Sequence, residues 1–152
     1  MFLSFSDELR KIAAARLQGK IEFQGLPVSI ENRRGSYRRG VDSEGNPWKT
    51  LMQAHYGYIR KSRTVRATGG DGEPIDVFVG PESESDIVVG VTLLKDSGKV
   101  DETKYFVGYR SPKDAVESFK DHYPTKWETL MGPHRVMTMD KFRTLLAKDQ
   151  KI

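Results

Sequence analysis

Three carboxylates lie close together in the middle of the sequence, directly after a run of basic residues. Asp71, Glu73 and Asp76 occur in "DGEPID", and the preceding loop "RKSRTVR" at residues 60–66 is strongly cationic. The glycine and proline between the acids predict a turn that directs several carboxylate oxygens toward one point. Oxygen ligands without cysteine favour Mg²⁺, Mn²⁺ or Ca²⁺ over Zn²⁺. The combination of acids and bases therefore predicts a magnesium site that binds phosphate groups.

Such a centre is suited to the hydrolysis of a phosphoanhydride. Mg²⁺ usually keeps several waters and binds substrate phosphates together with one or two carboxylates. Two such ions could lower the pKa of an attacking water, while lysine and arginine side chains neutralise the leaving phosphate. A simpler interpretation is that Asp-Gly pairs form turns and that runs of charge are solvated surface. Taken alone, the residue types favour this simpler interpretation.

The composition is that of one folded domain. The chain has 152 residues, of which 37% are hydrophobic and 30% charged, and its net charge is +4. A basic balance favours phosphate-bearing partners, either nucleotides or nucleic acid. The absence of cysteine excludes disulfides, thiolate zinc sites and cysteine nucleophiles. No apolar stretch is long enough for a signal peptide or a membrane span, so we expect a cytoplasmic protein without a membrane partner.

The elements that must hold the acids predict an α+β fold. Amphipathic periodicity predicts a helix over residues 6–18. Alternating or β-branched runs predict strands at 26–31, 35–41, 75–80, 86–94 and 103–109. Capping signals predict a helix over 111–122, and an apolar stripe predicts a helix over 139–148. The strands are too closely spaced for βαβ crossovers, which favours a small antiparallel barrel. We expect an N-terminal helix and linker over residues 1–25 and one barrel domain with C-terminal helices over 26–152.

Two motifs, in their order along the chain, resemble the family I soluble inorganic pyrophosphatases. "YGYI" at 56–59 and "DGEPIDVFV" at 71–79 are similar to the YGYI and DGDPxDVLV signatures of that family. The resemblance covers roughly residues 28–127 and implies a five-stranded OB-like barrel with peripheral helices, several Mg²⁺ ions and hydrolysis of pyrophosphate to two phosphates. The basic loop and the "RRG" at 38–40 look like pyrophosphatase-like domains of phages and mobile elements, which would act in a bacterial host's cytoplasm.

The resemblance also implies roles for individual residues. Asp71 and Asp76 match metal-binding aspartates, and Tyr56 matches a tyrosine on the phosphate side of the site. Glu73 stands where the family has an aspartate that helps to activate the attacking water, and its side chain is longer by one methylene. A shift of the base by this amount could lower the rate by a large factor.

Outside this window the resemblance implies roles with a looser register. The remaining candidates are the strand glutamate Glu31, the phosphate ligands Arg38, Arg39 and Lys49, the metal ligands Asp96, Asp101 and Glu102, the phosphate contact Lys104, and the pair Tyr123 and Lys126. Matching the first aspartate of "KDSGKVDETK" selects Asp101, whereas matching the lysine selects Glu102. Lys126 substitutes for an expected lysine because Pro124 occupies that position.

The sequence leaves other classes of function open. The leading hypothesis is a Mg²⁺-dependent hydrolase of pyrophosphate or of nucleotide phosphates. A non-enzymatic nucleic-acid module is the alternative, since an OB-like barrel with basic residues and aromatics such as Trp48 and Tyr58 could bind single strands. A third hypothesis is a degenerate pyrophosphatase fold that serves as a phage structural or interaction protein. Whether the protein forms a homo-oligomer is also left open.

Overall fold

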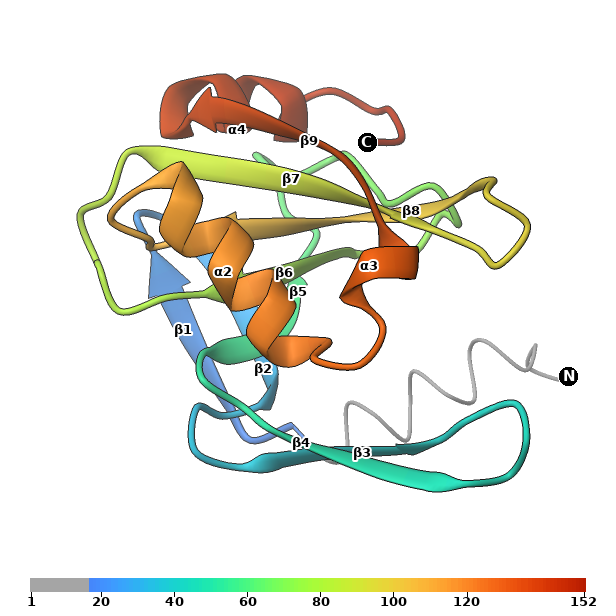
Figure 1. Ribbon diagram of the computed structural model, residues 1–152. Helices are drawn as coiled ribbons and strands as arrows, with labels where there is room; N and C mark the ends of the chain where they lie inside the picture. Colours follow the sequence, from blue (N-terminus) through green and yellow to red (C-terminus); the bar gives the residue numbers. More distant parts are fainter. Residues whose placement is uncertain (1–16) are drawn as a thin grey trace, which may run out of the picture.

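The computed structural model describes residues 17–152, and its strands form one large sheet and one separate hairpin (Figure 1). The strands are β1 Gly19–Phe23, β2 Leu26–Asn32, β3 Tyr37–Val41, β4 Pro47–Leu51, β5 His55–Ile59, β6 Ile75–Val79, β7 Ile87–Leu94, β8 Val100–Val107 and β9 Met131–Thr138. The helices are α2 Pro112–His122, α3 Trp127–Leu130 and α4 Met139–Leu146. The helix expected over residues 6–18 lies mostly outside the described residues.

The large sheet has the strand order β1-β2-β5-β6-β8-β7-β9. Its ladders are antiparallel except that β6 and β8 are parallel, with Val77 opposite Tyr105 and Val79 opposite Val107. The expected all-antiparallel arrangement is therefore wrong at this point. No helical crossover is needed, because β7 reverses the chain direction and β8 then inserts between β6 and β7.

The α+β class is confirmed, but the OB-like five-stranded barrel is not. β1 and β9 are the two ends of the strand order, and no ladder between described residues joins them. The β3–β4 hairpin is also unpaired with the large sheet in the described part of the chain. What the structure presents is an open mixed sheet with a separate two-stranded arm.

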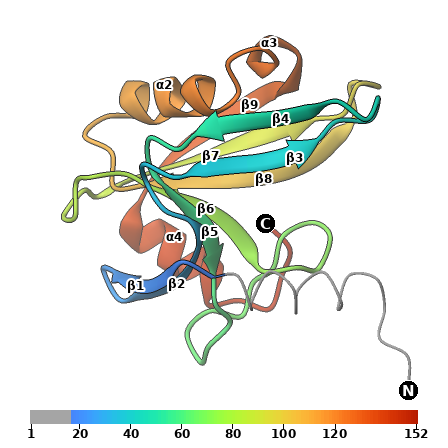
Figure 2. The ribbon, with the colours of Figure 1, turned by 90° about the horizontal axis from the view of Figure 1, so that it is seen from below.

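Both faces of the sheet are buried by helices. Alternation along the central strands sends Val77, Val79 and Tyr105 to one face, where they pack with α4, and Phe78 and Phe106 to the other. The second face is covered by α2, and Figure 2 shows α2 and α3 on one side of the sheet and α4 on the other. Burial on both faces explains why the sequences of these strands are continuous apolar runs.

The two long helices begin as the sequence predicts. The Ser111 hydroxyl accepts a hydrogen bond from the Asp114 backbone N–H at 3.1 Å, with a proline in the first turn of α2. The Thr138 hydroxyl caps α4 in the same way by accepting from the Lys141 N–H at 3.1 Å. These caps satisfy backbone donors that have no partner inside the helix.

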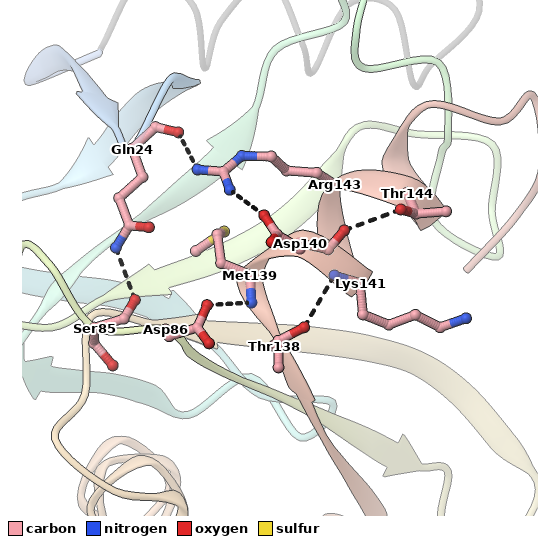
Figure 3. A network of polar contacts seen from close by, with 9 residues as sticks. All are labelled: Gln24, Ser85, Asp86, Thr138, Met139, Asp140, Lys141, Arg143 and Thr144. Atoms are coloured by element: carbon pink, nitrogen blue, oxygen red, sulfur yellow. Dashed lines mark hydrogen bonds and ion pairs between the residues drawn. The ribbon is translucent and has the colours of Figure 1, made fainter.

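A polar network fixes α4 against two turns of the sheet (Figure 3). The Arg143 guanidinium donates to the Gln24 carbonyl oxygen at 2.7 Å, and the Gln24 amide donates to the Ser85 carbonyl oxygen at 2.7 Å. The Asp86 carboxylate accepts from the Met139 N–H at 3.1 Å. The network therefore joins the β1–β2 turn, the β6–β7 connection and the start of α4.

The basic loop at 60–66 packs on the C-terminal segment. The N–H groups of Arg66 and Ala67 both donate to the Leu146 carbonyl oxygen, and the exposed Arg66 guanidinium lies 3.9 Å from the Asp149 carboxylate. Arg60 donates to the Ser29 hydroxyl at 3.1 Å. The contacts of these two arginines are thus structural.

None of the helices formed by the described residues has the length and apolar character needed to cross a membrane.

Candidate active site

The centre of the candidate site is a buried lysine on β8. The Lys104 side chain is only 4% exposed, and its ammonium donates to the Tyr56 hydroxyl at 2.6 Å and to the Asp76 carboxylate at 2.9 Å. A second carboxylate, that of Glu102, lies 3.2 Å from the same ammonium. One cation therefore joins residues from three strands.

Strand alternation explains why these side chains meet. Glu102 and Lys104 are two residues apart on β8 and so point to the same face. Asp76 lies two residues before Phe78 on the neighbouring β6, on the face covered by α2. Tyr56 on β5 pairs with Phe78, and its ring packs 4.7 Å from the Phe78 ring. The parallel pairing of β6 and β8 therefore brings the acidic starts of both strands to one end of the sheet.

The backbone requires a glycine in the "YGYI" motif. Gly57 lies opposite Ile30 across the β2–β5 ladder, and a Cβ there would stand 1.8 Å from the Ser29 carbonyl oxygen. Only glycine allows this close approach of the two strands. The approach holds Tyr56 and Tyr58 on either side of Gly57 in a fixed register with β6.

Glu31 enters the same environment through an irregularity of β2. The β2–β5 register shifts between Ile30 and Asn32, so Glu31 is the extra residue of a bulge. Burial and the neighbouring Asp76 carboxylate raise the pKa of Glu31, while Arg38 and Lys104 oppose this rise. Bulges commonly redirect a side chain next to a functional site, and here the redirected group is a carboxylate.

Arg38 covers the site from the β3–β4 hairpin. Its guanidinium carbon lies 4.4 Å from the centre of the Tyr56 ring, within the range of a cation–π contact. Burial lowers the pKa of Arg38, but Tyr56, a hydrogen bond with Tyr123 and the Asp76 carboxylate together raise it above its ordinary value. The hairpin and the residue that follows α2 thus meet above the sheet.

The electrostatics of the cluster keep its cation charged. Burial would lower the pKa of Lys104, but the surrounding Tyr56, Tyr123, Asp76 and Glu102 raise it well above its ordinary value. The pKa of Glu102 is raised by burial and by Asp76, and Lys104 counteracts that rise. Burial also raises the pKa of Tyr56, which keeps its hydroxyl protonated at neutral pH. The site therefore holds a fixed ammonium, a neutral phenol and crowded carboxylates.

The structure brings together about half of the residues predicted from the sequence. Tyr56, Asp76, Glu102 and Lys104 are in contact, and Glu31, Arg38 and Tyr123 surround them. Six other candidates are exposed: Asp71, Asp96, Asp101, Arg39, Lys49 and Lys126. Arg39 and Lys49 pair with each other across the hairpin, on the face opposite Arg38.

The acidic turn before β6 is internally ordered. The Asp71 carboxylate accepts from the Glu73 N–H at 2.9 Å, and the Glu73 carbonyl oxygen accepts from the Gly69 N–H at 2.8 Å. Glu73 is half-buried, whereas Asp71 is exposed. Asp101, the alternative to Glu102, is exposed at a bulge of β8, and its charge helps to raise the pKa of Glu102.

The carboxylates near Lys104 are the groups that could bind a metal ion. Within residues 17–152, no three His, Asp or Glu side chains come together closely enough to surround a metal by themselves. Asp76 and Glu102 share one ammonium between them and Glu31 lies nearby, so the carboxylates outnumber the buried lysine. Mg²⁺ needs only one or two carboxylates because water and substrate phosphates complete its shell. The oxygen-only donor set therefore fits Mg²⁺.

Comparison with known protein families shows which family the chain belongs to. A family model described as Inorganic Pyrophosphatase matches residues 9–147, which is most of the chain. The chain belongs to the inorganic pyrophosphatase family. Searches of curated proteins and of solved structures gave no match. The family resemblance that the sequence motifs carried is confirmed, and a pyrophosphatase-like domain extends well beyond the 56–79 window.

One feature of this pyrophosphatase-like site was not anticipated from the sequence. The resemblance implies that Lys104 is a catalytic residue that contacts phosphate, and the structure also pairs it with Asp76 and Glu102. The two-residue spacing of Glu102 and Lys104 within a strand-like run was the signal that could have predicted their contact. The partner from β6 was not predictable, because it depends on the parallel ladder.

Proposed function

We propose that the protein is a Mg²⁺-dependent hydrolase that cleaves pyrophosphate or a related phosphoanhydride with water. The observation that carries the proposal is the buried Lys104 ammonium, which contacts a tyrosine hydroxyl and two carboxylates on one face of the sheet. The groups around this ammonium, a hydroxyl and two carboxylates, are of the kinds suited to phosphate and metal chemistry. Membership of the inorganic pyrophosphatase family supports the same reaction class.

The carboxylates would hold the metal ions. Asp76 and Glu102 are the primary ligands in this proposal, and the exposed Asp71, Asp96 and Asp101 would complete the shells from adjoining turns and strand starts. When bound, Mg²⁺ would supply activation of the attacking water and neutralisation of the phosphate charge. Mn²⁺ has the same preference for oxygen ligands and would be an alternative.

The remaining groups would bind phosphate and move protons. Glu73 would accept a proton from the attacking water. The Tyr56 hydroxyl accepts its hydrogen bond from Lys104 and so keeps its own hydrogen for a phosphate oxygen. Lys104 and Arg38 would stabilise charge that develops on the leaving phosphate, which is the role of fixed cations in phosphoryl transfer. Tyr123, beside Arg38, would close the pocket.

The exposed cations would act at longer range. Arg39, Lys49 and Lys126 are solvent-exposed, so their main effect would be to attract an anionic substrate toward the site. The proposed location is the cytoplasm, and the resemblance to domains of phages and mobile elements would make this the cytoplasm of a bacterial host.

The test is phosphate release from pyrophosphate by the purified protein. We expect release with Mg²⁺, loss of release when EDTA is in excess, and recovery when Mg²⁺ is restored. Tripolyphosphate and ATP assayed in parallel would rank the leaving groups. No release from any of these substrates with Mg²⁺ or Mn²⁺ would contradict the proposal and favour a non-catalytic use of the fold.

A further inference from the structure

The indole of Trp48 lies on the face of the β3–β4 hairpin that carries Arg38. Trp48 pairs with Gly40 across the hairpin, and Arg38 pairs with Thr50, so these four residues share one face. A Cβ on Gly40 would stand 2.3 Å from Cζ2 and 2.5 Å from Cε2 of the indole. The ring therefore lies across the Gly40 backbone, and any larger residue at position 40 would displace it.

The indole is next to the proposed phosphate site. The Arg38 guanidinium carbon is 5.6 Å from the centre of the Trp48 ring and 4.4 Å from the centre of the Tyr56 ring. Arg38 therefore connects the two aromatic rings, and the Tyr56 hydroxyl in turn contacts Lys104. Tyr56 is almost fully buried, whereas Trp48 is 39% exposed.

The other exposed aromatic residue of the hairpin has a different setting. Tyr37 is 46% exposed and pairs with Leu51, on the opposite face from Trp48. Its ring is contacted by Lys49 at 4.8 Å and by Arg39 at 5.7 Å, both from the hairpin itself. Tyr37 thus offers a matched aromatic control on the same element.

Pyrophosphate alone would make no stacking contact with the exposed part of the indole, which also contacts Arg38. Pyrophosphate is a small dianion or polyanion without an apolar or aromatic surface, so a flat ring at the rim of its site gains nothing from it. A nucleobase has a π-face that stacks on aromatic side chains without requiring a particular base. A ring fixed beside an arginine that faces the phosphate site has the arrangement that a nucleotide needs.

We propose that Trp48 is a specificity-determining residue that stacks on the base of a nucleoside polyphosphate whose phosphates contact Arg38 and Lys104. The location of the phosphates rests on the proposed function. The reaction is unchanged: the oxygen of one water bonds to one phosphorus, the bridging oxygen leaves with the other phosphate group, and the water's protons pass to the products or solvent. The substrate class becomes nucleoside polyphosphates rather than pyrophosphate alone.

Binding of two non-hydrolysable analogues tests this inference without turnover. Calorimetry with Mg²⁺ would compare the β,γ-methylene analogue of ATP with methylenediphosphonate, an analogue of pyrophosphate. We expect Trp48→Ala to raise the Kd of the nucleotide analogue about 10-fold more than that of methylenediphosphonate. Trp48→Phe should recover most of the nucleotide affinity, and Tyr37→Ala should leave both values unchanged.

Fluorescence gives a second readout. The chain has two tryptophans, so in a Trp127→Phe background the emission comes from Trp48 alone, and stacking of a base should quench it. Equal weakening of both analogues by Trp48→Ala, absence of quenching, or failure of the nucleotide analogue to bind would overturn the inference. Trp48-dependent binding without any phosphate release would instead reject the proposed hydrolysis and leave the nucleotide site standing.

Discussion

At the scale of single residues, the proposed hydrolysis depends most on Lys104. It is a buried cation with a hydroxyl partner and two carboxylate partners. A buried charge is tolerated when it is paired and hydrogen-bonded, and here the pairing extends over three strands. The same arrangement gives the site a cation that burial does not neutralise, because its pKa is raised well above the ordinary value.

Replacing this cation tests its role. Lys104→Met keeps a long side chain but removes the charge, and we expect kcat/KM for pyrophosphate to fall by about 10²–10³-fold, as for loss of one electrostatic contact to a developing oxyanion. Steady-state phosphate release measures this. Lys141→Met, at an exposed lysine of α4, is the matched control. Activity of Lys104→Met within a few-fold of the wild type would show that the ammonium has only a structural role.

A substitution of Asp71 tests whether its carboxylate only shapes the acidic turn or also binds metal. Its carboxylate accepts a hydrogen bond from the Glu73 N–H, and an Asn side chain can accept the same bond. If Asp71 only shapes the turn, Asp71→Asn should be active. We expect instead a loss of about 100-fold or more in kcat, because the amide is a poor metal ligand. Thermal unfolding run in parallel should show an unchanged Tm, and a large fall in Tm would contradict a role confined to the metal.

At the scale of elements, the periodic segments were predictable and the ladders were not. The capping signals at Ser111 gave the start of α2, and the apolar stripe gave α4. Four strands, β1, β4, β5 and β9, were not predicted. β1 is a short alternating edge strand within residues 1–25, where a helix and linker were expected, and β9 is largely exposed and contains Gly132 and Pro133. Edge strands of this kind carry little apolar pattern.

At the candidate site, too, residues within one motif were predictable, whereas contacts that depend on strand pairing were not. The motif residues Tyr56 and Asp76 were predictable because both occur in a short, ordered window. The choice of Glu102 over Asp101 as the neighbour of Lys104 depends on strand alternation and on a bulge, which the linear match could not reveal. The contact of Arg38 with Tyr56 depends on the fold of the hairpin over the sheet.

The C-terminal end of α2 is held to the chain that follows the hairpin by a neutral histidine. His122 Nε2 accepts from the Gln53 N–H at 3.0 Å, and Nδ1 donates to the Ser118 carbonyl oxygen at 2.6 Å. Burial lowers the pKa of His122, Arg38 lowers it further, and the Ser118 carbonyl and Asp121 act in the opposite direction. Protonation would place a second N–H against the Gln53 N–H.

This contact predicts a pH dependence of stability. Above the ordinary histidine pKa of about 6.5 the ring is neutral in both the folded and unfolded states, so it adds no pH dependence. As the pH falls below that value, the unfolded state takes up a proton first, and the free energy of unfolding should decrease by up to about 1.4 kcal/mol per pH unit. Urea unfolding at several pH values between neutral and mildly acidic measures this.

A substitution at the same position isolates the histidine from other titrating groups. His122→Gln keeps an acceptor for the Gln53 N–H but cannot be protonated. The decrease in stability toward acidic pH should therefore be smaller in His122→Gln than in the wild type. The same decrease in both proteins would assign the effect to the carboxylates instead.

At the scale of the whole molecule, the two faces of the sheet differ in what covers them and in the charged groups that they carry. One face of the sheet packs with α4 and is closed by the Gln24–Arg143 network, while the face covered by α2 also carries the charged cluster near its edge. The hairpin is outside the sheet and contributes Arg38 and the exposed Trp48 to the cluster.

We propose that the cluster around Lys104 hydrolyses pyrophosphate with the help of Asp76. The most direct measurement is phosphate release from pyrophosphate with saturating Mg²⁺ by the wild type and by Asp76→Asn, with Asp149→Asn as a control at an exposed carboxylate. Asp76→Asn preserves shape and removes the charge, so we predict a loss of at least ~100-fold with the control unaffected. Turnover by Asp76→Asn equal to that of the wild type would show that the Asp76 carboxylate has no part in hydrolysis.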